Sequence, residues 1–148
     1  MNYKKNVKSY ICKDEDEMLK LGKEFASKLK KGDVVSLRGS LGSGKTVFVK
    51  GVAEGLKISD NITSPTFTLV QIYNNSQLQM NHLDLYRLNS EEDFYNIGGM
   101  DFLSPTGITL IEWTEIINEI LPDNTYFINI SILDNLSREV TISFKENE

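Results

Sequence analysis

The first half of the chain alternates short apolar runs, typical of buried strands, with apolar residues at helical spacing. One stripe at helical spacing predicts a helix and consists of Met18, Gly22, Phe25, Ala26 and Leu29. Acidic residues at 14–17 suit the start of this helix, and Gly32 is its expected end. Residues 33–38 predict a buried strand, residues 47–56 a second helix, and residues 7–12 a weaker first strand.

The second half contains two pairs of extended segments, each joined by a short polar turn. Residues 67–73 and 78–85 flank the first turn. Residues 125–133 and 138–144 flank the second. Strands joined so closely are antiparallel, so we expect a mixed sheet and not a simple parallel array. The other predicted elements are short helices over 89–95 and 114–121 and a buried strand over 108–111.

A phosphate-binding motif lies between the buried strand at 33–38 and the second helix. Residues 39–46 read Gly-Ser-Leu-Gly-Ser-Gly-Lys-Thr, which matches G-x-x-x-x-G-K-S/T in the strand–loop–helix context that this motif requires. The glycines let several backbone N–H groups point at phosphate oxygens. Lys45 can reach the β- and γ-phosphates, and the Thr46 hydroxyl can bind Mg²⁺. The predicted nucleotide-binding residues are Leu41, Gly42, Ser43, Gly44, Lys45 and Thr46.

Length and composition fit one globular α/β domain. The 148 residues, 40% hydrophobic and 25% charged, are enough to bury a full core. We therefore expect a single-domain P-loop NTPase over residues 1–148, with a mixed parallel and antiparallel sheet flanked by helices. A dinucleotide-binding fold does not fit, because its third glycine would fall at Val47.

Two carboxylates follow predicted strands beside the motif. Hydrolysis of a nucleotide needs a carboxylate to hold Mg²⁺ and a group to orient the attacking water. Asp84 lies at the end of the first hairpin, and Glu112 follows the next buried strand. The alternative is that each carboxylate only pairs with a nearby cation such as Arg87. The predicted catalytic residues are Lys45, Asp84 and Glu112, and the predicted metal ligands are Thr46, Asp84 and Glu112.

Four further features each allow two interpretations. His82, the only histidine, is more typical of a packed or hydrogen-bonded residue than of a catalytic one. Trp113, the only tryptophan, fits core packing better than base stacking, although it adjoins Glu112. The hydroxyls at 63–66 fit either a switch that senses the γ-phosphate or a rigid turn. Arg138 fits either a nucleotide contact or an exposed hairpin residue.

Charge and composition narrow the classes of partner. With a net charge of -5 and no concentrated basic run, the chain is not expected to bind a polynucleotide on its own. No apolar stretch approaches the ~20 residues needed to cross a bilayer. Residues 1–9 lack the apolar segment of a secretory signal. The single cysteine, Cys12, allows no internal disulfide, which fits a cytoplasmic location.

Three longer runs are more specific than the phosphate-binding motif, which many ATPases share. They are Ser-Pro-Thr-Phe-Thr-Leu-Val at 64–70, His-Leu-Asp-Leu-Tyr-Arg at 82–87 and Ile-Glu-Trp at 111–113. Because these runs occur in this order and with this spacing, the chain resembles the TsaE (YjeE) family. Members of that family are small bacterial ATPases required to make N6-threonylcarbamoyladenosine (t6A) in tRNA.

The resemblance implies a role for each candidate in the site. Lys45 and Thr46 would bind the phosphates of ATP and Mg²⁺, and Asp84 would be the Walker-B-type carboxylate. Glu112 would act at the metal or at the attacking water. Arg138 matches a family arginine near the nucleotide and would be a further nucleotide-binding residue.

The resemblance also implies partners and a switch. Residues 63–66 would form the switch segment, and family members act with TsaB and TsaD. TsaD carries the transferase chemistry, and ATP hydrolysis by TsaE drives or resets the TsaB–TsaD complex, with tRNA bound through these partners. The chain departs from the family by having Ser40 for Asp, Ser43 for Ala and Thr114 for Pro.

Two other functions are compatible with a phosphate-binding loop. A small kinase would need an acceptor site and usually a lid that carries arginines. The three arginines, Arg38, Arg87 and Arg138, lie in no insertion of that kind. A nucleotide-dependent scaffold would bind ATP without hydrolysing it.

Overall fold

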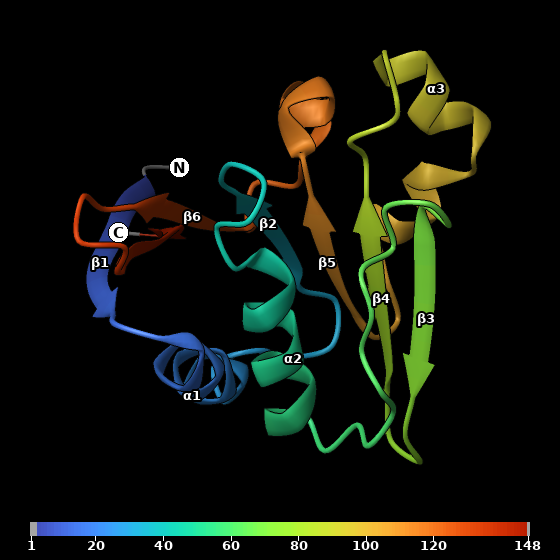
Figure 1. The fold of residues 1–148 in the computed structure, drawn as a ribbon. Helices are drawn as coiled ribbons and strands as arrows, with labels where there is room; N and C mark the ends of the chain where they lie inside the picture. Colours follow the sequence, from blue (N-terminus) through green and yellow to red (C-terminus); the bar gives the residue numbers. More distant parts are fainter. Residues whose placement is uncertain (1–2, 148) are drawn as a thin grey trace.

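The computed structural model describes residues 3–147, with the side chains of residues 6–144. The strands are β1 (Tyr3–Cys12), β2 (Val34–Arg38), β3 (Val70–Asn74), β4 (Gln79–Asp84), β5 (Ile108–Glu112), β6 (Tyr126–Ile132) and β7 (Arg138–Asn147). The helices are α1 (Glu15–Ala26), α2 (Lys45–Gly55) and α3 (Glu91–Asn96), with 3-10 helices η1 (Gly99–Leu103) and η2 (Thr114–Ile120). All seven strands form one sheet in the order β1-β7-β6-β2-β5-β4-β3 (Figure 1).

The sheet is mixed, as the short polar turns predicted. Strand β2 runs parallel to β5 and β6, and β4 runs parallel to β5. Both expected hairpins, β3–β4 and β6–β7, are antiparallel. Strand β1 begins earlier than expected because it pairs with β7 along its whole length. The carboxyl ends of β2, β4 and β5 therefore meet at one edge of the sheet, where open α/β sheets place their ligands.

Helices cover both faces of the sheet, which confirms the expected layers. Helices α1 and α2 lie side by side on one face (Figure 1), and α3 and η2 pack on the other. In β2, Leu37 belongs to the first core and Val34 to the second. Leu110 and Ile111 divide β5 in the same way. Burial on both faces explains why these strands are continuous apolar runs.

The prediction that Gly32 ends the first helix was wrong, because α1 ends at Ala26. The Ser27 hydroxyl donates a hydrogen bond to the Glu24 carbonyl at 2.7 Å. Such a local bond competes with continued helix. Leu29 has left the helix but still packs against the first core. Gly32, with a φ of 98°, serves the turn before β2 instead.

The first hairpin strand also begins later than expected, at Val70. Leu69 has a φ of 68°, and its N–H donates to the Pro65 carbonyl at 2.7 Å. This turn interrupts the extended chain and leaves Phe67 84% exposed. The short helix expected after β5 is a 3-10 helix with a kink at Ile117.

The close contact between α1 and α2 depends on glycine. A Cβ atom at Gly51 would lie 2.2 Å from the Leu19 carbonyl oxygen of α1. We expect Gly51→Ala to lower the free energy of unfolding by about 1–3 kcal/mol, because overpacking outweighs the better helix propensity of alanine. Urea unfolding followed by circular dichroism measures the change. The control is Lys50→Ala, an exposed neighbour on α2, and an unchanged midpoint for Gly51→Ala would contradict the packing.

Candidate functional site

The phosphate-binding motif forms a curled loop between β2 and α2. Gly42 and Gly44 have φ values of 77° and 110°, which residues with a side chain rarely adopt. Together with the ends of β4 and β5, the loop lines a cavity of about 300 Å³. All six loop residues predicted to bind nucleotide line this cavity: Leu41, Gly42, Ser43, Gly44, Lys45 and Thr46.

Lys45 is buried at the first position of α2. Its Nζ donates to the Gly39 carbonyl at 2.5 Å and lies 3.8 Å from the centroid of the Trp113 ring. Burial lowers the pKa of Lys45, and the nearby Glu112 and Asp84 carboxylates act in the opposite direction. A buried ammonium of this kind is stabilised by an anionic ligand.

Asp84 and Glu112 lie side by side where β4 and β5 end, because they are partners in the parallel register. Both are buried and both line the cavity. Among the described residues, neither carboxylate forms a salt bridge with a lysine or an arginine. The alternative pairing with Arg87 is therefore wrong: that guanidinium lies over the ring of Phe67, 5.6 Å from its centroid.

The donor set of the cavity suits Mg²⁺. The Thr46 hydroxyl donates to Oε2 of Glu112 at 3.4 Å, and Asp84 lies beside them. Within residues 3–147, no group of three or more His, Cys, Asp and Glu side chains could enclose a metal ion. Mg²⁺ needs no such enclosure, since it is usually held by one or two carboxylates together with substrate phosphates and water.

The loop at 63–66 contacts one carboxylate directly. The Thr66 hydroxyl donates to Oδ2 of Asp84 at 2.8 Å, and the backbone N–H of Tyr86 donates to Oδ1 at 2.9 Å. The hydroxyls of Ser64 and Thr66 are 2.8 Å apart, and both residues line the cavity. The loop thus has internal hydrogen bonds, as a rigid turn does, and also reaches the site, as a switch does.

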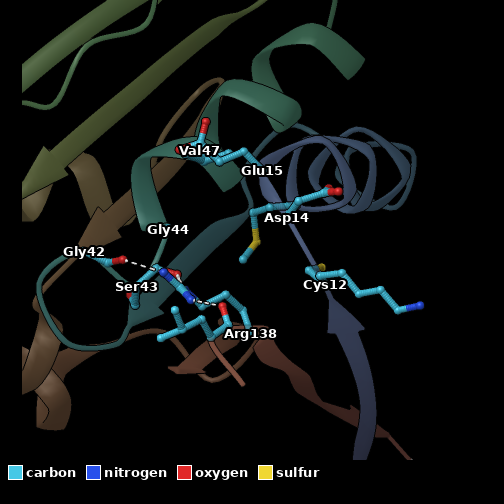
Figure 2. A pocket seen from close by; sticks show the side chains of 11 residues that line it. Cys12, Asp14, Glu15, Gly42, Ser43, Gly44, Val47 and Arg138 are labelled. Atoms are coloured by element: carbon cyan, nitrogen blue, oxygen red, sulfur yellow. Dashed lines mark hydrogen bonds between the residues drawn. The ribbon is translucent and has the colours of Figure 1, made fainter. Parts of the chain in front are cut away.

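Arg138 supports the phosphate loop from the start of β7 (Figure 2). Its guanidinium donates to the carbonyls of Ser43 at 3.0 Å and Gly42 at 3.3 Å, and also to the carbonyl of Leu136. The same side chain lines a hollow of about 160 Å³ beside the loop, bounded by Cys12 and the start of α1. Arg138 therefore lies next to the predicted nucleotide site, and its hydrogen bonds hold the loop's backbone.

Two side chains next to the carboxylates make contacts whose partners the sequence did not predict, although His82 is buried and hydrogen-bonded as expected. Trp113 has a φ of 59°, so the chain turns sharply after Glu112 and places the indole over Lys45. Nε2 of His82 lies 2.6 Å from Oε2 of Glu112. The only sequence signal for either contact was adjacency, because Trp113 follows Glu112 and His82 lies two residues before Asp84.

Thr114, where the resemblance predicts proline, anchors the turn after Trp113. Its buried hydroxyl lies 2.6 Å from the Ser36 hydroxyl and accepts from Nε of Arg38 at 3.0 Å. These bonds join the turn after β5 to β2. The position is therefore fixed by hydrogen bonds in this chain.

Comparisons with known proteins agree over most of the chain. The family model described as "Threonylcarbamoyl adenosine biosynthesis protein TsaE" matches residues 12–140, which include the loop, both carboxylates and Arg138. The chain is 41% identical over 133 residues to the tRNA threonylcarbamoyladenosine biosynthesis protein TsaE of Treponema pallidum, covering 90% of this chain and 98% of that protein. It is 38% identical over 128 residues to the protein of the same name from Bacillus subtilis, covering 86% and 80%. The crystal structure of YdiB from Bacillus subtilis superposes with a TM-score of 0.73 at 31% identity, covering 97% of this chain and 88% of that one.

Proposed function

Since the chain belongs to the TsaE family, whose members are involved in tRNA threonylcarbamoyladenosine biosynthesis, we propose that it is an ATPase of that pathway. In this proposal it binds ATP with Mg²⁺ and hydrolyses the ATP to drive or reset a TsaB–TsaD complex. One observation carries the proposal: Lys45, Thr46, Asp84 and Glu112 line a single cavity at the carboxyl ends of parallel strands. This is the set of groups that phosphoryl transfer to water needs.

The binding step uses the loop and the start of α2. Backbone N–H groups of the loop and the positive end of the α2 dipole stabilise the negative phosphates. Lys45 adds its charge to the β- and γ-phosphates. The Thr46 hydroxyl and the Asp84 carboxylate would hold Mg²⁺, which neutralises charge on the transferring phosphate when bound.

The hydrolytic step depends on Glu112. Its Oε2 accepts hydrogen bonds from His82 and Thr46, whereas Oε1 accepts none from the described residues, and the residue lines the cavity. In the proposed step, Glu112 orients a water molecule for attack on the γ-phosphate and accepts its proton. Removing a well-placed general base typically costs about 10²- to 10⁴-fold in rate.

The proposal also includes partners and a compartment. Across residues 3–147, no helix is long and apolar enough to cross a membrane. A net charge of -5 is unfavourable for independent binding of tRNA. Because of this charge, we assign contact with tRNA to the TsaB–TsaD partners. A cytoplasmic reaction is part of the same proposal.

The kinase alternative is disfavoured by the surroundings of the three arginines. Arg38 binds Thr114 and Asn118, Arg87 lies over Phe67, and Arg138 binds backbone carbonyls of the phosphate loop. None of them lies in a lid over the cavity, where a kinase stabilises the transferring phosphate. A scaffold would bind ATP through the same loop, so the measurement of phosphate release distinguishes it from an ATPase.

Phosphate release from Mg-ATP separates the three functions. The purified protein is assayed alone and with TsaB and TsaD. We expect phosphate release that the partners stimulate and that excess chelator abolishes. Phosphate that appears on a small acceptor would identify a kinase, and ATP binding without phosphate release in every mixture would identify a scaffold.

A further inference from the structure

The only histidine of the chain is buried against Glu112. His82 is 0% exposed, and its Nε2 lies 2.6 Å from Oε2 of Glu112. The contact follows from the sheet: His82 and Asp84 are two residues apart on β4, so they share one face. Asp84 is the register partner of Glu112 on the neighbouring strand. His82 itself does not line the cavity, whereas both carboxylates do.

The hydrogen-bond pattern indicates which ring nitrogen is the donor. Nδ1 of His82 is buried, and no described residue binds it. A ring with its proton on Nε2 leaves only a lone pair unpaired at Nδ1, whereas a proton on Nδ1 would leave a buried N–H without a partner. The second arrangement is the less favourable. The Nε2 proton therefore donates to Oε2 of Glu112, an assignment made from the hydrogen-bond network.

This hydrogen bond restrains the Glu112 carboxylate. Oε2 is held by Nε2 of His82 and lies 3.4 Å from the Thr46 hydroxyl. With that oxygen fixed, rotation of the carboxylate is limited, and Oε1, which accepts no hydrogen bond from the described residues, keeps one orientation. Removing a hydrogen-bond partner that orients a functional group typically lowers activity by about 10- to 100-fold.

We propose that His82 is a positioning residue for Glu112. It fixes the orientation of the carboxylate that orients the attacking water, and it does so without touching nucleotide, metal or water. This inference rests on the proposed ATPase function and adds the residue on which its catalytic carboxylate depends. A histidine that only filled the core would contribute to folding and leave turnover unchanged.

Two variants and a neighbouring control test the role in phosphate release with the TsaB–TsaD complex. We expect His82→Ala to lower kcat by about 10- to 100-fold, with KM for ATP within about twofold of wild type. His82→Gln retains an N–H donor near the position of Nε2 and should recover much of the loss. The control is Asn81→Ala: Asn81 is the buried neighbour on β4, but it donates to Thr109 and should keep the wild-type kcat.

The effect must also depend on Glu112. In a Glu112→Gln background, adding His82→Ala should lower kcat little further, because the residue that it positions has already lost its function. Folding of each variant is checked by circular dichroism. If His82→Ala fails to fold, the ring ¹⁵N comparison of Glu112→Gln with wild type still decides, because it leaves His82 in place. A wild-type kcat in folded His82→Ala, or losses that multiply in the double variant, would overturn the proposal.

A spectroscopic measurement separates this inference from the proposed function. As the chain holds one histidine, its ring ¹⁵N signals in NMR need no assignment. The Nε2 signal should move in Glu112→Gln and stay unchanged in Glu115→Gln, a change at an exposed carboxylate. Absence of phosphate release by the wild type would refute the ATPase. An Nε2 signal that is the same in Glu112→Gln and in the wild type would refute the positioning role. It would also be refuted if the wild type is active and His82→Ala is equally active.

Discussion

Replacing Lys45 with alanine is expected to lower phosphate release with TsaB and TsaD by about 100- to 1000-fold, the usual cost of removing one preorganised charge at a reacting centre. Lys45 is buried in the cavity, where burial lowers its pKa and the Gly39 carbonyl and the Trp113 ring are its near partners. Its charge is therefore worth more to a bound phosphate than an exposed charge would be. ATP affinity should fall as well, measured by isothermal titration calorimetry.

The matched control for this variant lies on the same helix. Lys50→Ala removes an exposed lysine of α2 and should keep both ATP affinity and phosphate release within about twofold of wild type, because surface charges contribute little. Equal effects of the two substitutions would mean that only the net charge matters. Wild-type turnover by folded Lys45→Ala would show that this loop does not hold the reacting phosphate.

Glu112→Gln is expected to slow hydrolysis strongly while leaving ATP bound. The amide keeps the shape of the side chain but cannot accept the proton of the attacking water, so kcat should fall by about 10²- to 10⁴-fold. ATP affinity should change by less than about threefold, because the loop, Lys45 and Thr46 are intact. Single-turnover phosphate release and calorimetry on the same preparation measure the two quantities.

A nearby acidic residue provides the comparison for Glu112. Glu119 is exposed in the 3-10 helix η2 that follows Trp113, and Glu119→Gln should leave both kcat and ATP affinity unchanged. If Glu112→Gln instead kept kcat at saturating Mg²⁺ and raised the Mg²⁺ concentration needed for activity, Glu112 would be a metal ligand and not the group that orients water.

Local sequence patterns predicted the parts of the fold that depend on residues close together in the chain. The glycines and Lys45 predicted the loop between β2 and α2, and the short polar turns predicted both hairpins, which the structure confirms. The errors are local in origin too. Ser27 ends α1 early through its hydroxyl, and Leu69 adopts a left-handed conformation that delays β3. Neither effect is visible in an apolar pattern.

The individual contacts between distant segments could not be predicted from the apolar pattern, because they depend on the order of strands. His82 meets Glu112 only because β4 and β5 are neighbours in parallel register. Arg138 reaches the loop carbonyls of Gly42 and Ser43 because β7 pairs with β6, which pairs with β2. Such neighbourhoods appear only once the sheet order is known.

If the proposed function holds, ATP hydrolysis in this cavity sustains t6A formation by the partner complex. The most direct measurement counts t6A formed per TsaB–TsaD complex over many turnovers, with wild-type protein, Lys45→Ala or no added protein. We expect continued formation with the wild type and arrest near one product per complex in the other two mixtures. Equal yields with wild-type protein and folded Lys45→Ala would contradict the proposed function.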